Sequence, residues 1–180
     1  QLFVAQTQPP SLAAITPFSV IAASFNSTHY PGGVLNTGFA VEWTKQRVEE
    51  ARPEGQEWAA ARITAGDETC TANQLLRLQN PDLTAEIAAT PFWTDTLGNQ
   101  LAPRSFVDKI TVPTFVAGAW QDEQTGGHFA TMLDRFTGTA HLYATLVNGL
   151  HTESIGPSVF PRFVEFLDLY VARRVPSLTT

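Results

Sequence analysis

The clearest pattern along the chain is a near-continuous apolar run at residues 110–120, "ITVPTFVAGAW". A run of this kind is typical of a strand in a parallel sheet that is covered on both faces. Residues 140–148, "AHLYATLVN", predict a second strand, and a third is expected at Ala13–Ser19. A short helical stretch precedes this last strand and is stopped by Pro9-Pro10.

Segments with helical periodicity lie between and after these predicted strands. Between the strands at 110–120 and 140–148, apolar side chains recur at i, i+3, i+4 and i+7, which predicts a helix (Phe129, Met132, Leu133 and Phe136). A closing helix is predicted beyond residue 156, with one apolar stripe (Phe163, Val164, Leu167, Tyr170 and Val171). Alternation of strands and helices favours an α/β fold with right-handed crossovers.

Residues 39–106 interrupt this alternation with helical stretches that are broken at Pro53, Gly55 and Gly66. They lie between two predicted strands, so the chain must leave the sheet and return to it. We therefore expect a core formed by residues 1–38 and 107–180, and a helical cap formed by residues 39–106.

Composition narrows the classes of function. The 180 residues are 43% hydrophobic and 16% charged, as in globular domains, and their net charge of −6 argues against a nucleic-acid surface. No apolar run approaches the roughly 18 residues that a membrane-spanning helix needs. The only cysteine, Cys70, excludes an internal disulfide and a cysteine-rich metal site. The first residues also lack the features of a signal peptide.

Two polar residues follow neighbouring strands: Asp122 after the run at 110–120, and His151 after the run at 140–148. The carboxyl ends of parallel strands share one rim, so we expect the two side chains to lie close together. A carboxylate beside an imidazole fixes the tautomer of the ring and stabilises its protonated form during general-base catalysis.

Simpler readings of these residues stay open. Asp122 has the position of a helix N-cap, and a single histidine in a loop is often only solvated. A metal site of Asp122, Glu123 and His128 is disfavoured, because side chains of sequence neighbours diverge at a strand end. Tryptophans are more often core residues than pocket residues, but Trp120 lies two residues before Asp122 and is a candidate to line a cleft.

The group that such a pair would activate is missing from the sequence. α/β-Hydrolases present their serine in a G-x-S-x-G turn that precedes the acid and the histidine in the chain. No such turn occurs here, since the segment Gly156-Pro157-Ser158 follows the histidine and has Phe160 at its fifth position. The elbow is followed by a helix, and the chain opens in a helical pattern. A nucleophile is therefore expected a few residues before Gln1.

Four stretches, "QLFVAQTQPPSLAAITPFSV", "YPGGVLNTGFAVEW", "VPTFVAGAWQDEQTGGHF" and "NGLHTESIGP", resemble the CocE/NonD acyl hydrolases. This family includes cocaine esterase and the Xaa-Pro dipeptidyl-peptidases. The resemblance implies the C-terminal half of an α/β-hydrolase fold with a helical cap, and a Ser-His-Asp triad in which Asp122 is the acid and His151 the base. Tyr30, which begins the "YPGG" stretch, is a further candidate for the substrate pocket.

The resemblance also implies parts that these residues lack: an oxyanion-hole tyrosine, the nucleophile serine and a C-terminal jelly-roll domain. The expected function is the acid/base half of a serine hydrolase that cleaves ester or amide bonds. It needs no cofactor or metal and takes a small-molecule substrate, with the remainder of the parent chain as its partner. This chain alone is expected to be inactive. The alternative is a non-catalytic binding or assembly module on the same scaffold.

Overall fold

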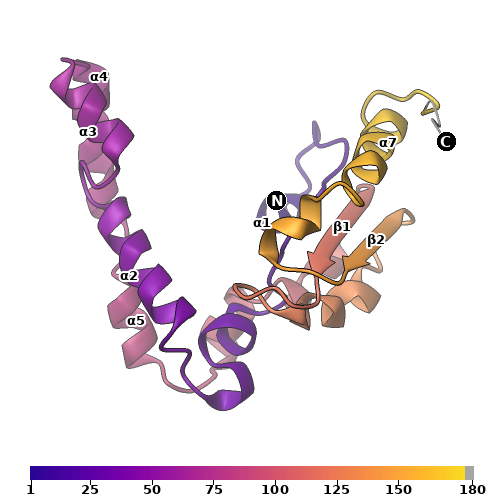
Figure 1. Ribbon diagram of the computed structural model, residues 1–180, viewed down its shortest axis with the longest axis horizontal. Coiled ribbons are helices and arrows are strands. Elements are labelled where there is room, and N and C mark those ends of the chain that lie inside the picture. The colour runs from indigo at the N-terminus through magenta and orange to yellow at the C-terminus, as the bar shows by residue number, and fades with distance from the viewer. Residues whose placement is uncertain (177–180) are drawn as a thin grey trace. The chain divides into compact units, whose positions relative to one another are not determined.

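The computed structural model describes residues 1–176, apart from the side chains of Leu83 and Leu97. The chain divides into two units. Unit 1 contains residues 1–35 and 94–180, whose described part ends at residue 176, and unit 2 contains residues 36–93. Within unit 1 the strands β1 (Thr114–Ala119) and β2 (Leu142–Val147) lie side by side and point the same way (Figure 1).

Strands β1 and β2 pair in parallel register, from Thr114 opposite Leu142 to Ala119 opposite Val147. The connection between them contains the 3₁₀ helix η6 (Gly127–Arg135). We expected an α-helix here. The tighter geometry still places Phe129 and Met132 on one face, because side chains three residues apart are aligned in a 3₁₀ helix. Both side chains are buried.

The expected strand at Ala13–Ser19 pairs with the other edge of β1, but only through isolated bridges at Ile15 and Phe18. The main-chain bonds run as in a parallel ladder, with Phe115 N–H donating to the Ile15 carbonyl and Ser19 N–H to the Ala117 carbonyl. The carbonyl of Pro17 accepts the Ala117 N–H at 3.2 Å, but proline has no N–H to donate to β1 in return. The strand is therefore interrupted rather than continuous.

Both faces of β1 are covered, as the near-continuous apolar run predicted. Val116 belongs to a cluster that also contains Phe129 and Met132 from η6. Phe115 and Ala117 point to the opposite face and pack with Phe166 of α7 (Phe160–Tyr170). A glycine is required at position 118, because a Cβ there would lie 2.3 Å from the Phe129 ring.

The predicted apolar stripe of α7 is confirmed in part, because Phe163, Leu167 and Tyr170 pack against the core. The buried side chain of this helix is Phe166, which is 3% exposed, whereas Val164 and Val171 are 40% and 52% exposed. The helix carries apolar residues around much of its circumference, so periodicity alone identified only part of the packed face. The contact with Phe115 on β1 selects it.

The other elements of unit 1 are short. The chain begins with α1 (Leu2–Ala5), whose Leu2 and Ala5 are buried against the core. The remaining helices of this unit are the π-helical turn η1 (Phe25–His29), α6 (Asp95–Gln100) and the 3₁₀ turns η2 (Pro31–Gly33), η4 (Pro103–Ser105), η5 (Val107–Lys109) and η7 (His151–Ile155).

Unit 2 is helical throughout its described secondary structure. It contains α2 (Phe39–Ala51), α3 (Glu57–Thr64), α4 (Glu68–Gln74), η3 (Leu75–Gln79) and α5 (Leu83–Ala89). Figure 1 shows α5 alongside α2 within this unit. The unit shares residues 39–93 with the expected cap, whereas residues 94–106 belong to unit 1. Its role as a cap stays a prediction.

Candidate active site

Main-chain hydrogen bonds between the two chain segments continue beyond the ends of β1 and β2. Trp120 N–H donates to the Val147 carbonyl at 3.0 Å, and Gln121 N–H donates to the Gly149 carbonyl at 3.1 Å. The chain segments that follow β1 and β2 therefore leave the sheet together, at the same rim. This pairing places Asp122 and His151 next to one another.

Asp122 sits in a tight turn whose main chain faces its carboxylate. One oxygen, Oδ1, accepts the N–H groups of Gln124 and Thr125, each at 2.8 Å. Gly126 then adopts a φ of +68°, a conformation that glycine tolerates better than other residues. The side chain of Asp122 is only 1% exposed, so the turn fixes the carboxylate in one orientation.

Opposing effects act on the pKa of Asp122. Burial raises this pKa, because it disfavours the charged form. The N–H groups of Thr125 and Gln124 and the ring of His151 act in the other direction, and the net result is a pKa below the ordinary carboxyl value. Asp122 is therefore a buried carboxylate that stays ionised at neutral pH.

His151 completes the pair. Its Nδ1 lies 2.8 Å from Oδ2 of Asp122, and its side chain is 28% exposed. An ionised carboxylate can only accept a hydrogen bond, so this contact selects the tautomer in which Nδ1 carries the proton. In a neutral ring Nε2 is then the basic atom, and the carboxylate stabilises the imidazolium that forms when Nε2 takes a proton.

Several residues that the sequence analysis did not single out hold the loop of His151. Glu123 accepts the His151 N–H at 3.1 Å, and the His151 carbonyl accepts the hydroxyls of Ser19 and Ser154 at 2.9 and 3.0 Å. The position of Ser19 at the end of a predicted strand was the available signal for its role. Glu123 was considered only as a metal ligand.

The two candidate pocket residues have different surroundings. Trp120 is 53% exposed, and its ring packs against that of Phe129 with the centroids 6.1 Å apart. Tyr30 is 8% exposed and stacks on Phe25 at 4.7 Å. Trp120 thus presents ring surface to solvent next to the turn of Asp122, whereas Tyr30 presents little. Both assignments to a substrate pocket stay predictions.

The other histidines have separate environments. His29 Nδ1 lies 3.0 Å from the carbonyl oxygen of Ser24, the ring of His141 lies 5.2 Å from that of Tyr170, and His128 is exposed. Among the described residues, no group of three or more histidine, cysteine, aspartate or glutamate side chains is arranged to hold a metal ion. Within residues 1–176, no helix has the length and apolar character needed to cross a bilayer.

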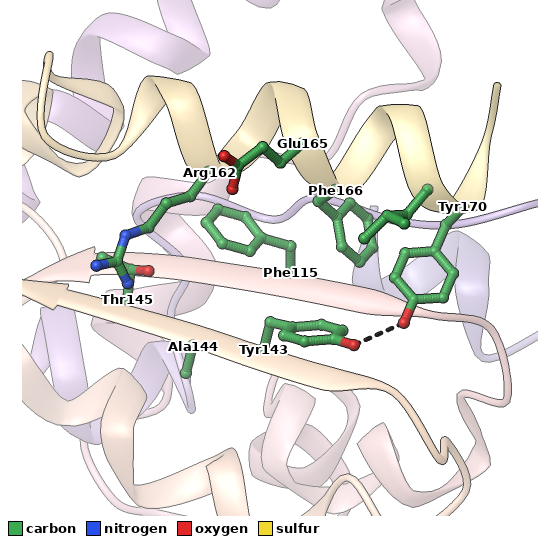
Figure 2. A pocket seen from close by; sticks show the side chains of 9 residues that line it. Phe115, Tyr143, Ala144, Thr145, Arg162, Glu165, Phe166 and Tyr170 are labelled. Atoms are coloured by element: carbon green, nitrogen blue, oxygen red, sulfur yellow. Dashed lines mark hydrogen bonds between the residues drawn. The ribbon is translucent and has the colours of Figure 1, made fainter. Parts of the chain in front are cut away.

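A groove of about 390 Å³ lies between β2 and α7 (Figure 2). Tyr143 and Tyr170 line it, with their hydroxyl oxygens 2.6 Å apart, and Arg162 and Glu165 of α7 stand on its rim. Neither member of the Asp122–His151 pair lines this groove. It is therefore distinct from the candidate active site.

Comparison with protein families gives a match over most of the chain. The model of the X-Pro dipeptidyl-peptidase family (S15 family) matches residues 1–153, which include both Asp122 and His151. No curated protein shows a significant match.

Two crystal structures of a CocE/NonD family hydrolase from Staphylococcus aureus resemble the chain. They match with TM-scores of 0.66 at 19% and 20% sequence identity, over 98% of this chain. The chain spans 28% and 27% of the length of those two structures. An α/β fold family hydrolase from Bacillus anthracis also matches, with a TM-score of 0.48 and 13% identity, over 94% of this chain and 62% of that one. The S. aureus matches show that the described chain has part of an α/β-hydrolase fold.

Proposed function

The chain belongs to the X-Pro dipeptidyl-peptidase (S15) family, and on that premise we propose that it supplies the acid and the base of a serine hydrolase. The observation that carries the proposal is the 2.8 Å contact between Nδ1 of His151 and the buried carboxylate of Asp122. The reaction is the cleavage of an ester or amide bond by a Ser-His-Asp triad.

His151 acts in both halves of this reaction. Its Nε2 takes the proton of the serine hydroxyl while the serine oxygen attacks the acyl carbon, and then gives that proton to the departing alcohol or amine. In the second half it takes a proton from water, which attacks the acyl-enzyme, and returns it to the serine oxygen. Asp122 stays ionised throughout and stabilises the imidazolium, because main-chain N–H groups hold its pKa low.

The nucleophile in this proposal comes from a segment outside residues 1–180. These residues contain no G-x-S-x-G turn, and in α/β-hydrolases the serine precedes the acid and the histidine in the chain. The related hydrolase structures are much longer than this chain, which covers about 28% of one of them. The oxyanion hole and a C-terminal jelly-roll domain are proposed to belong to the same parent polypeptide.

The helical insertion, residues 39–106, is proposed to act as a cap that shapes the acyl pocket. Its helices expose large apolar side chains, including Trp43 at 43% and Trp58 at 55%. Exposed aromatic rings in a segment that interrupts the catalytic fold are suited to cover an apolar acyl group.

Fluorophosphonate labelling tests the proposal directly. The parent polypeptide should label at one serine and hydrolyse p-nitrophenyl esters. Replacement His151→Ala should lower kcat by several powers of ten, because it removes the general base. The matched control is His128→Ala, which removes an exposed histidine of the same unit and should leave kcat unchanged. Full activity of the His151→Ala protein would remove the proposal.

A second candidate function is a non-catalytic binding or assembly module. It is favoured by the absence of a G-x-S-x-G turn from these residues. The labelling experiment separates the two functions, because a parent polypeptide without a reactive serine would not be labelled at all.

A further inference from the structure

The loop that carries His151 is short and closely packed. It begins at Gly149, where a Cβ would lie 1.8 Å from a carboxylate oxygen of Glu153. That same carboxylate accepts the Leu150 N–H at 2.7 Å. The loop is therefore turned back on itself immediately before His151, and its exact path decides where the imidazole points.

The main chain of His151 is held at both of its polar groups. Its N–H donates to Oε2 of Glu123 at 3.1 Å. Its carbonyl accepts two hydroxyls, from Ser19 at 2.9 Å and from Ser154 at 3.0 Å, and these two hydroxyls are 2.6 Å apart. Two distant chain segments, those of Ser19 and Glu123, thus converge on the turn that carries His151.

The two serines contribute differently to this arrangement. Ser154 is 3% exposed, so its hydroxyl is shielded from competing water. Ser19 adopts a φ of +46°, which is uncommon for a residue with a side chain. Its N–H is bonded to the Ala117 carbonyl of β1 at 2.9 Å, so the hydroxyl is presented from the edge of the sheet. Backbone strain of this kind persists where the surrounding contacts over-determine the conformation.

Two consecutive acids, Asp122 and Glu123, bind different groups of His151. Asp122 holds the ring through Nδ1, and Glu123 holds the main-chain N–H. The pKa of Glu123 is lowered by its own main-chain N–H and next by that of His151, so its carboxylate is ionised at neutral pH. A single turn after β1 therefore fixes both the backbone and the side chain of the histidine.

We propose that Glu123 is a positioning residue, which works with the hydroxyls of Ser19 and Ser154 to hold the His151 backbone so that its Nδ1 reaches Asp122. The part of this inference that concerns catalysis rests on the proposed function. Its structural content, the coupling of Glu123 to the hydrogen bond of the His151 ring, does not require an active enzyme.

The coupling is measured by NMR on protein labelled with ¹⁵N-histidine. The chain has four histidines, so the three others serve as internal references. Two signals are followed: hydrogen exchange of the His151 main-chain N–H, and the ring ¹⁵N and Nδ1–H resonances that report the tautomer. The same variants are examined in the parent polypeptide for kcat and KM on p-nitrophenyl esters.

Replacement Glu123→Ala should speed exchange of the His151 N–H by about tenfold, because it removes a hydrogen bond to a charged acceptor. It should also weaken or broaden the Nδ1–H resonance, and lower kcat by about tenfold with little change in KM. Glu123→Gln keeps an acceptor oxygen at the same reach and should restore most of each signal. The matched control is Glu49→Ala, which removes an exposed carboxylate of α2 and should change none of them.

The outcomes separate this inference from the function on which it rests. If Glu123→Ala leaves the His151 exchange rate and the ring resonances unchanged, Glu123 does not position the histidine, whatever the activity. If the ring resonances change but no serine of the parent polypeptide is labelled, the positioning role stands and the hydrolase function fails. If Glu123→Ala lowers kcat equally with Glu123→Gln and without any change at the ring, the inference is wrong.

Discussion

The two units of the chain differ in the side chains that they bury. Unit 1 has a continuous apolar core on both faces of β1, with Val116 and Ala117 completely buried. Among the described residues of unit 2, the buried side chains are small or polar: Ala40, Thr44, Ala59 and Gln74. Large apolar residues of unit 2 face solvent instead. The Asp122–His151 pair thus lies in the unit that has the dense core, where strand ends hold side chains in fixed positions.

The ion pairs of the two units differ in their separation along the chain and in their burial. Ion pairs of unit 2 are local and lie at its surface, such as Lys45–Glu42 and Arg52–Glu49, each at 2.7 Å. Exposed pairs of this type contribute little to stability. In unit 1 the pair His151–Asp122 joins residues 29 positions apart, and its acid is almost completely buried. Burial makes each such hydrogen bond stronger and its loss more costly.

The largest effect is expected from Asp122→Asn in the parent polypeptide. The amide keeps an oxygen for the N–H groups of the turn, but presents a donor or a weaker acceptor to His151 and so disfavours the Nδ1–H tautomer. We expect kcat on a p-nitrophenyl ester to fall by about 10⁴-fold. Steady-state kinetics measures the loss. An equal fall for Asp95→Asn, an exposed acid at the start of α6, would contradict a specific role for Asp122.

The next largest effect concerns the cores. Phe129 is 1% exposed and packs over Gly118, so Phe129→Ala should lower the free energy of unfolding of unit 1 by about 3–5 kcal/mol. Phe92 of unit 2 is 79% exposed, and Phe92→Ala should change stability by less than about 0.5 kcal/mol. Urea unfolding, monitored by hydrogen exchange separately in each unit, gives both changes in the free energy of unfolding. Comparable losses would remove the distinction between the two cores.

As the pH falls, unit 1 should lose stability before unit 2. The loss should be smaller than that caused by Phe129→Ala. The pKa of Asp122 in the fold lies below its ordinary value of 3.8, so its contribution to stability is complete above that value and is lost as the pH falls through the lowered pKa. Asp67 of unit 2 also has a lowered pKa, through the Cys70 N–H, but its side chain is 33% exposed, against 1% for Asp122. Unfolding measured between neutral pH and about pH 3 should show the larger slope in unit 1.

Asp122→Asn serves as the control for this acid effect, because the amide does not titrate. The slope of unit 1 should decrease in this variant. A slope that stays the same would assign the acid sensitivity of unit 1 to other carboxylates.

The smallest effect is expected at a helix end of unit 2. The Asp82 side chain accepts the Ala85 N–H at 3.0 Å and caps α5. Asp82→Ala should reduce the stability of that helix by about 1 kcal/mol, whereas Asp82→Ser keeps a capping oxygen and should restore most of it. Hydrogen exchange of the first amides of α5 measures the change. A matching loss of protection in β1 would show that the two units unfold together.

Hydrophobic periodicity was sufficient to place both strands and the closing helix. The fold class and the family resemblance are confirmed by the comparisons. Periodicity identified only part of the packed face of α7. Phe166 is buried instead of Val164, because that choice depends on the partner Phe115. It also missed the interruption that Pro17 makes in the pairing with β1.

The sequence by itself determined that an acid and a histidine each follow a buried strand, because strand ends can be located from apolar runs and chain order. Only the tertiary structure decided that these side chains meet at 2.8 Å and that Glu123, Ser19 and Ser154 hold the histidine between them. Hydrogen bonds between residues up to 132 positions apart depend on loop paths and backbone angles. Local propensities do not encode those paths, since they arise when separate segments pack against one sheet.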